Sequence, residues 1–264
     1  MLYSRSYHAQ STQYQPVVVF LHGLLGSGED WLGCIQNLKG TPCITIDLPG
    51  HGQSRQIDCS DFLSCCKRIE ETLLQHINSD TPILLVGYSM GGRIAMSGIA
   101  LNYFPSLNIQ YLIVEGGNFG LSSELDRKKR YQNDQAWAKR FTSEPIEHVL
   151  SDWYQQSVFS SLNHEQRQTL TTKRSANLGA SVGRMLLATS LAKQEYLLEA
   201  MLEKGSKTHY VFGAQDEKFR QMAKRSGLSY SQVANAGHNV HHEQPLAFAN
   251  IIKNQFQTHF GEQS

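Results

Sequence analysis

The chain has 264 residues, of which 40% are hydrophobic and 18% are charged, and its formal net charge is +1 at pH 7. These values are typical of a globular protein with one sizeable core, and they exclude an intrinsically disordered chain. The near-zero net charge argues against nucleic acid as a partner. No apolar run approaches the ~20 residues of a membrane-spanning helix, so we expect no membrane insertion.

The N-terminal segment, residues 1–15, is polar and lacks the apolar run of a signal peptide. The five cysteines are odd in number and show no spacing typical of metal ligands. We therefore expect free thiols in a reducing compartment, which predicts a cytoplasmic protein without a metal site. The sequence leaves the oligomeric state open.

In chain order, six short apolar runs rich in β-branched residues predict strands, several of which end at glycine-rich turns. The six runs are residues 17–21, 43–46, 82–86, 109–114, 209–212 and 230–234. Helical periodicity over residues 29–38, 61–77 and 90–101 separates the early strands. Strands that alternate with helices predict an α/β protein with a mostly parallel sheet and helices on both faces.

The alternation stops after Gly117. From residue 122 to about residue 204 the sequence is polar, rich in glutamine and basic residues, and shows helical rather than strand periodicity. The simplest interpretation is a helical cap, residues 119–204, inserted into a core made of residues 1–118 and 205–264. Because no repeat or low-complexity linker interrupts the chain, we expect the cap to pack against the core.

A G-x-S-x-G motif, Gly87-Tyr88-Ser89-Met90-Gly91, lies between a predicted strand and a predicted helix. Its glycines permit a strained turn that passes close to the neighbouring strand and helix. This turn would place the Ser89 hydroxyl above the sheet at a helix N-terminus, where backbone dipoles favour negative charge. The motif is common as a bare pattern, and its strand–turn–helix context is what makes it informative.

Two further residues complete a predicted catalytic triad. A serine hydroxyl becomes reactive when a base takes its proton, and His238 lies in a loop after the last predicted strand. Asp216 follows the strand at residues 209–212, where its carboxylate can orient an imidazole. The order Ser89, Asp216, His238 is the order typical of the α/β-hydrolase fold.

The loop at residues 22–26, which follows the first predicted strand at residues 17–21, predicts an oxyanion hole. On this fold a backbone N–H from such a loop, here that of Leu24, joins the N–H of the residue after the nucleophile, here Met90. We interpret His22 and His51 as residues that brace loops.

Seven stretches spread over most of the chain form a pattern more specific than the triad. They are residues 21–31, 87–95, 115–118, 137–141, 152–156, 159–163 and 236–239. These stretches resemble the 2-succinyl-6-hydroxy-2,4-cyclohexadiene-1-carboxylate (SHCHC) synthase, or MenH, family of menaquinone biosynthesis. Three of them lie in the predicted cap, which diverges between activities on this fold and therefore carries most of the specificity.

The resemblance implies a carbon–oxygen lyase that eliminates pyruvate from 2-succinyl-5-enolpyruvyl-6-hydroxy-3-cyclohexene-1-carboxylate. His238 and Ser89 would together remove the proton α to the succinyl ketone, and the Leu24 and Met90 amides would stabilise the enolate. The reaction requires no cofactor, and the sequence shows no phosphate-binding loop.

A polycarboxylate substrate needs cationic groups in its pocket. Arg93 lies four residues after Ser89, about one turn along the same face of the predicted helix. The other pocket residues that the resemblance implies are Tyr88, Arg130, Trp153 and Arg174. Arg127 is an alternative to Arg130.

Two other functions remain open from the sequence. A serine hydrolase that cleaves an ester or a carbon–carbon bond would use the same triad, with acyl-enzyme chemistry at Ser89 and a more apolar pocket. A non-catalytic binding protein of the same fold could also retain the triad, and it would bind its ligand without changing it.

Overall fold

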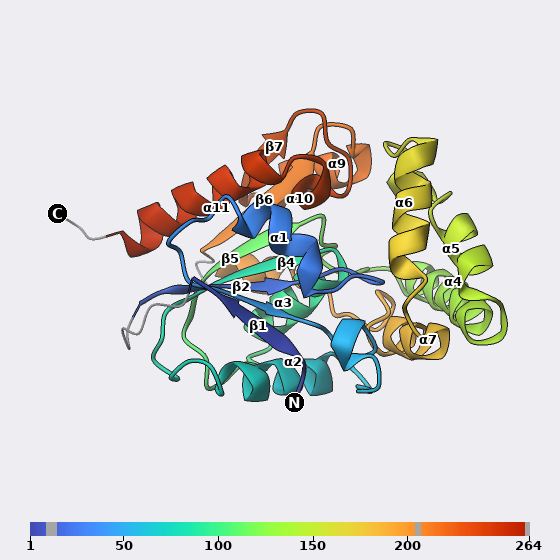
Figure 1. Cartoon of the computed structure of the whole chain (residues 1–264), viewed down its shortest axis with the longest axis horizontal. Coiled ribbons are helices and arrows are strands. Elements are labelled where there is room, and N and C mark those ends of the chain that lie inside the picture. The colour runs from blue at the N-terminus through green and yellow to red at the C-terminus, as the bar shows by residue number, and fades with distance from the viewer. Residues whose placement is uncertain (9–14, 204–206, 262–264) are drawn as a thin grey trace.

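A computed structural model describes residues 1–8, 15–203 and 207–261 of the chain. Seven strands form one sheet in the order β1-β3-β2-β4-β5-β6-β7 (Figure 1). The strands are β1 (Ser4–Tyr7), β2 (Val17–Leu21), β3 (Cys43–Ile46), β4 (Ile83–Tyr88), β5 (Ile109–Glu115), β6 (Thr208–Gly213) and β7 (Ser229–Val233). All neighbouring strands are parallel except β1, which pairs antiparallel with β3. The predicted mostly parallel sheet is confirmed.

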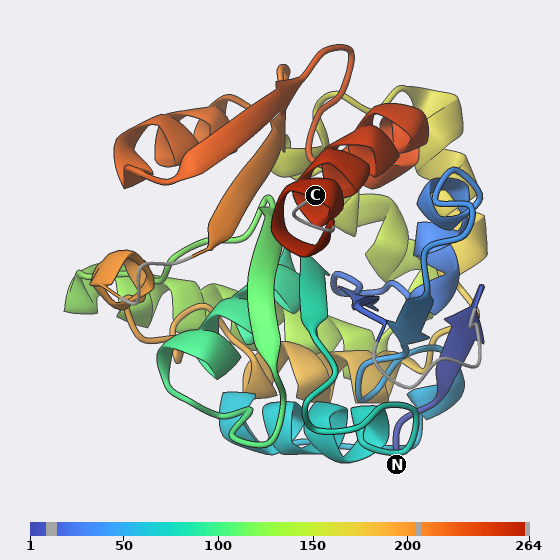
Figure 2. The ribbon, with the colours of Figure 1, turned by 90° about the vertical axis from the view of Figure 1, so that its left-hand side faces the viewer.

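The central strands are buried on both faces, which explains their continuous apolar sequence. Every residue of β2 is buried, and alternate side chains enter different clusters. Val18 and Phe20 pack in the cluster formed with α1 (Leu32–Ile35), α10 (Val240–Glu243) and α11 (Pro245–Phe260). Val19 and Leu21 pack in the cluster formed with α2 (Phe62–Leu73), α3 (Met90–Ala100) and α9 (Glu217–Ser226). Figures 1 and 2 show these two helical layers on opposite faces of the sheet.

Between β5 and β6 the described chain is helical, and we call this segment the helical insert. Its helices are α4 (Glu124–Ser143), α5 (Ile146–Trp153), α6 (His164–Arg174), α7 (Gly179–Ala188) and α8 (Leu198–Glu203). Helices α4 to α7 lie together beyond the end of the sheet (Figure 1) and share an apolar cluster that also contains Leu25 of the core. The predicted end of the cap at residue 204 lies outside the described residues.

Several elements differ from the sequence-based expectation. The predicted helix over residues 29–38 is a 3-10 turn, Gly28–Trp31, followed by the short helix α1. Strand β1 and the helices α9, α10 and α11 were not predicted. Strand β1 is polar and lies at the sheet edge, so backbone pairing with β3 rather than an apolar pattern defines it.

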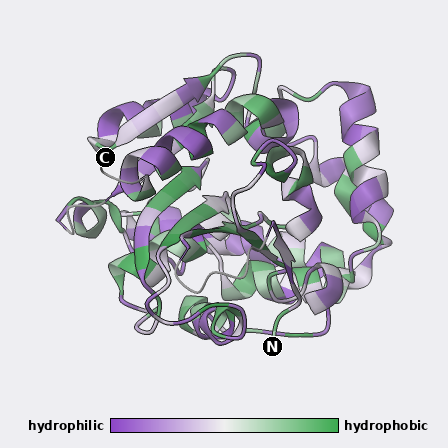
Figure 3. Ribbon diagram, turned by 60° about the vertical axis from the view of Figure 1, so that its left-hand side comes forward, coloured by the Kyte–Doolittle hydropathy of each residue, from purple (hydrophilic) through white to green (hydrophobic). Residues whose placement is uncertain are grey.

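The hydropathy of the ribbon follows this architecture. Figure 3 shows hydrophobic residues along the central strands and hydrophilic residues on the outward faces of the surrounding helices. Within the described ranges, no helix combines the length and apolar character needed to cross a bilayer.

Candidate active site

Ser89 occupies the sharp turn between β4 and α3. Its φ of 49° lies in the left-handed region, which is strained for a residue with a side chain. A Cβ at Gly87 would lie 2.7 Å from the Gly91 carbonyl oxygen, so glycine is required for this close approach. Met90 is the first residue of α3, and its N–H therefore has no acceptor within the helix.

His238 and Asp216 form the second half of the predicted triad. The His238 Nδ1 and the Asp216 Oδ2 lie 2.8 Å apart, and both side chains are buried. Asp216 caps α9, where its Oδ1 accepts a hydrogen bond of 3.2 Å from the Phe219 N–H. The His238 ring stacks on the Phe219 ring with centroids 4.8 Å apart. The carboxylate and the imidazole are thus held on both sides, and this fixes the ring orientation.

The backbone at Gly116 allows His238 to approach β5. Its φ is +57°, and a Cβ there would lie 2.7 Å from His238 Cε1. A side chain at this position would displace the imidazole.

Two buried histidines brace the predicted oxyanion loop. His51 Nε2 accepts a hydrogen bond of 2.9 Å from the Leu25 N–H, and His22 Nε2 accepts one of 2.9 Å from the Leu48 N–H. Only a neutral imidazole can accept these bonds. Burial lowers the pKa of His22 to about 4 and that of His51 to about 3, which keeps both rings neutral at pH 7. The Leu25 carbonyl accepts a 3.1 Å bond from Asn177 of the helical insert, so the loop is held from both sides.

A cavity of about 220 Å³ lies between the core and the helical insert. Seven predicted site residues line it, and they are Leu24, Ser89, Met90, Arg93, Arg130, Trp153 and His238. Lys218 also lines the cavity, whereas no aspartate or glutamate of the described residues does. Three cations without a carboxylate among the lining residues favour an anionic ligand.

Arg93 is the most deeply buried of the three cations. Its side chain comes from α3, and the residue is 8% exposed. Its Nη1 donates a 2.6 Å hydrogen bond to the Thr189 carbonyl, and no carboxylate of the described residues lies within ion-pair distance. Burial lowers the pKa of Arg93 to about 9, so the charge is retained at pH 7 but is poorly compensated.

Arg130 of α4 is oriented by a neighbouring carboxylate. Its Nε donates a 2.8 Å hydrogen bond to Asp134, which also accepts a 2.7 Å bond from the Ser190 hydroxyl. The ion pair with Asp134 thus fixes the position of the Arg130 guanidinium at the cavity.

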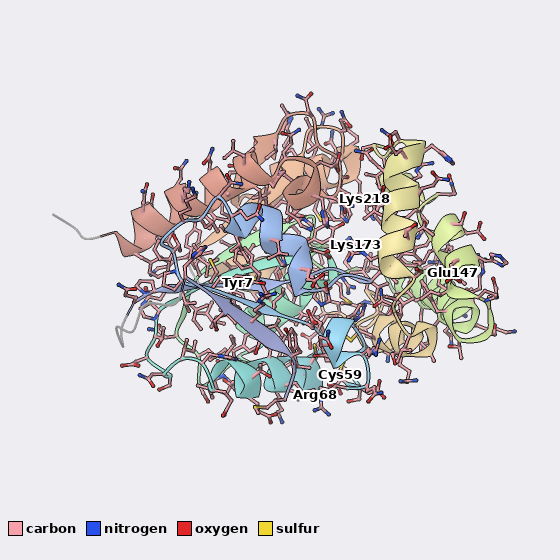
Figure 4. The ribbon with its side chains drawn as sticks, viewed as in Figure 1. Tyr7, Cys59, Arg68, Glu147, Lys173 and Lys218 are labelled. Atoms are coloured by element: carbon pink, nitrogen blue, oxygen red, sulfur yellow. The ribbon has the colours of Figure 1, made fainter. Side chains whose placement is uncertain are left out.

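Lys218 was not predicted as a site residue. It is the second residue of α9 after Asp216, and it lies at the side of the core that faces the helical insert (Figure 4). Desolvation lowers the pKa of Lys218, with a further contribution from the nearby Arg130 charge. Its position two residues after the predicted triad acid was the available sequence signal.

The structure places two other predicted residues away from the cavity lining. Arg174 donates a 2.7 Å hydrogen bond to Asp30 and, with Lys173, lines a separate cavity of about 230 Å³ at the junction of α6 and the core. The Tyr88 hydroxyl donates to the side-chain oxygen of Asn239, while its ring packs against the ring of His238 with centroids 5.3 Å apart.

The alternative residue Arg127 also lies elsewhere. It donates a 3.1 Å hydrogen bond to the Ala192 carbonyl and lines a different surface depression.

A nucleophile turn after β4, an acid after β6 and a histidine after β7 on a mostly parallel sheet define the α/β-hydrolase class. Residues 16–245 match the α/β-hydrolase fold family, and the chain belongs to it.

Individual members of this class are similar to the chain over most of its length. The 2-succinyl-6-hydroxy-2,4-cyclohexadiene-1-carboxylate synthase of Yersinia enterocolitica is 44% identical over 248 residues, 93% of this chain and 89% of that protein. The synthase of the same name from Yersinia pseudotuberculosis serotype O:3 is 43% identical over 92% of this chain and 89% of that protein. The structure of MenH from S. aureus superposes with a TM-score of 0.87 at 27% identity, covering 98% of this chain and 99% of that one. The chain therefore belongs to the SHCHC synthase family.

Proposed function

We propose that this protein is an SHCHC synthase of menaquinone biosynthesis, a lyase that eliminates pyruvate from 2-succinyl-5-enolpyruvyl-6-hydroxy-3-cyclohexene-1-carboxylate. The observation that carries the proposal is the cavity that Ser89 and His238 line together with three cations and, among the described lining residues, no carboxylate. Such a cavity suits a substrate with several carboxylates and disfavours the neutral esters of a typical serine hydrolase.

In the proposed reaction, Asp216 holds His238 so that the second ring nitrogen serves as the base. Together with Ser89, His238 removes the proton α to the succinyl ketone. The backbone N–H groups of Leu24 and Met90 stabilise the resulting enolate. Its electron pair moves through the ring and breaks the bond between the ring carbon and the enolpyruvyl oxygen, which leaves the conjugated cyclohexadiene. The departing enolate of pyruvate takes up a proton from the protonated His238, which yields pyruvate.

Arg93, Arg130 and Lys218 bind the substrate carboxylates in this proposal, and Trp153 forms an apolar wall of the cavity. Arg174 reaches the substrate only in an arrangement in which it has left Asp30. We assign Tyr88 to the pocket through its packing on His238.

The proposal also covers the surroundings of the site. The helical insert, residues 119–204, serves as a cap over the cavity, and the core comprises residues 1–118 and 205–264. The chemistry is an acid–base elimination that amino-acid side chains can perform, and the partner is a small polycarboxylate in the cytoplasm.

The decisive experiment measures pyruvate release from the enolpyruvyl substrate, made fresh by the preceding enzyme of the pathway, with diene absorbance as a second readout. We expect rapid release by the parent protein. The Ser89→Ala variant should lose most turnover but still bind the product, since the cations remain. Release no faster than spontaneous decay would refute the proposal, and a burst of product from an activated ester would then support a serine hydrolase.

A further inference from the structure

Glu115 connects the two halves of the candidate active site, although it does not line the cavity. It is the last residue of β5 and pairs in register with Tyr88 at the end of β4. Its backbone carbonyl accepts a 2.8 Å hydrogen bond from the Ser89 N–H. Its side chain is 0% exposed and points to the chain segment that follows His238.

The Glu115 carboxyl group holds that segment through His241. Its Oε1 accepts a 3.2 Å hydrogen bond from the His241 backbone N–H, and the His241 Nδ1 lies 2.9 and 2.8 Å from its two oxygens. His241 is 1% exposed, and its ring packs against Trp31 and Tyr88 with centroids 4.4 and 4.5 Å apart. These contacts leave His241 little freedom to move relative to β5.

The protonation states suit this role. Burial raises the pKa of Glu115 to about 8 and lowers that of His241 to about 3. His241 is therefore a neutral ring at pH 7, and Glu115 is mainly a protonated carboxyl that donates to His241 Nδ1, so the contact is a hydrogen bond between neutral groups rather than an ion pair.

We propose that Glu115 is a positioning residue that sets the placement of His238 relative to Ser89. One residue binds the nucleophile through its backbone and the segment after the base through its side chain. A shift of either attachment therefore changes the separation of the reacting groups. The inference rests on the proposed function of Ser89 and His238.

Two substitutions at Glu115 distinguish a requirement for side-chain length from a requirement for charge. Glu115→Gln keeps the length of the side chain, and its amide can satisfy both His241 groups by accepting from the backbone N–H and donating to the unprotonated Nδ1. Glu115→Asp keeps the ionisable carboxyl group but is one methylene shorter, so the His241 segment must shift or lose its hydrogen bonds. Positioning predicts that the glutamine variant outperforms the aspartate variant, whereas a requirement for charge predicts the reverse.

The experiment measures kcat and KM for pyruvate release and the rate at which a fluorophosphonate modifies Ser89, followed by intact-protein mass spectrometry. Glu115→Gln should retain most of the parental kcat. Glu115→Asp should lower kcat by ~10- to 100-fold with little change in KM, because misplacement by ~1 Å can cost about 100-fold. The phosphonate rate should fall in parallel. The matched control is His209→Gln, a buried histidine held by Ser229 and Ser231 at 3.0 and 2.8 Å, which should alter the Tm but not kcat.

A Glu115→Asp variant with parental kcat and labelling rate would overturn the inference, as would one more active than Glu115→Gln. If Glu115→Asp does not fold, His241→Asn, which withdraws the ring from Glu115, should give the same loss of kcat at constant KM. A parent protein that releases no pyruvate, but whose Ser89 labelling is slowed by Glu115→Asp, would refute the proposed function alone. A parent protein that shows neither reaction would overturn both.

Discussion

Replacing Arg93 with methionine should weaken substrate binding and at the same time stabilise the fold. A hydrogen bond to a charged group contributes ~1.5–3 kcal/mol, so its loss should raise KM by ~10- to 150-fold. The same guanidinium is 8% exposed without a carboxylate partner among the described residues, and burial lowers its pKa. Replacing a buried ion pair by well-packed apolar residues is often neutral or stabilising by ~1–4 kcal/mol, and we expect a change in the same direction for this poorly compensated guanidinium. The Tm should therefore rise by ~2–4 °C for each kcal/mol gained.

Steady-state pyruvate release and thermal unfolding of the same preparations test both effects. Arg184→Met is the matched control, because this arginine of α7 is exposed, pairs with Asp58 and does not line the cavity. It should leave KM unchanged and alter the stability by less than ~1 kcal/mol. An Arg93→Met protein with parental KM, or with a Tm several degrees below the parent, would refute this account of the arginine.

Three further substitutions test other parts of the site. Asp216→Asn should lower kcat by ~10⁴-fold with little change in KM, because the amide favours the wrong imidazole tautomer, and a loss below tenfold would contradict that role. Lys218→Met should raise KM about tenfold in the pyruvate assay, and an unchanged KM would remove this residue from the anion pocket. His51 has a folded-state pKa of about 3, below its unfolded value of 6.5, so the unfolded chain binds more protons between these pH values. Stability should fall by ~1.4 kcal/mol for each pH unit of acidification in that window, and His51→Gln should flatten the dependence of Tm on pH.

The local part of the site was accessible from the sequence. The turn at Ser89 depends on residues 87–91, whose glycines permit one backbone path between a strand and a helix. Five of the six apolar runs correspond closely to β2, β3, β4, β5 and β6, because buried parallel strands need continuous apolar residues. The sixth, at residues 230–234, corresponds to the edge strand β7, which has fewer buried side chains.

Contacts between distant segments of the chain could not be predicted from such local patterns. Arg174 and Asp30 are 144 residues apart, and Glu115 and His241 are 126 residues apart. The partner of each side chain depends on how the helical insert and the C-terminal loops pack against the sheet, which a pattern within one segment does not encode. The hydroxyl of Tyr88 likewise reaches Asn239, 151 residues away.

A cavity lined by three cations and, among the described residues, by no aspartate or glutamate also attracts inorganic anions. Phosphate or sulfate in a buffer would compete with the organic carboxylates for the same guanidinium and ammonium groups. Apparent affinities measured in such buffers therefore depend on the concentration of the competing anion. This dependence weakens when the buffer anion is bulky and singly charged. Catalytic constants for this protein are comparable only between solutions matched in anion identity as well as in ionic strength.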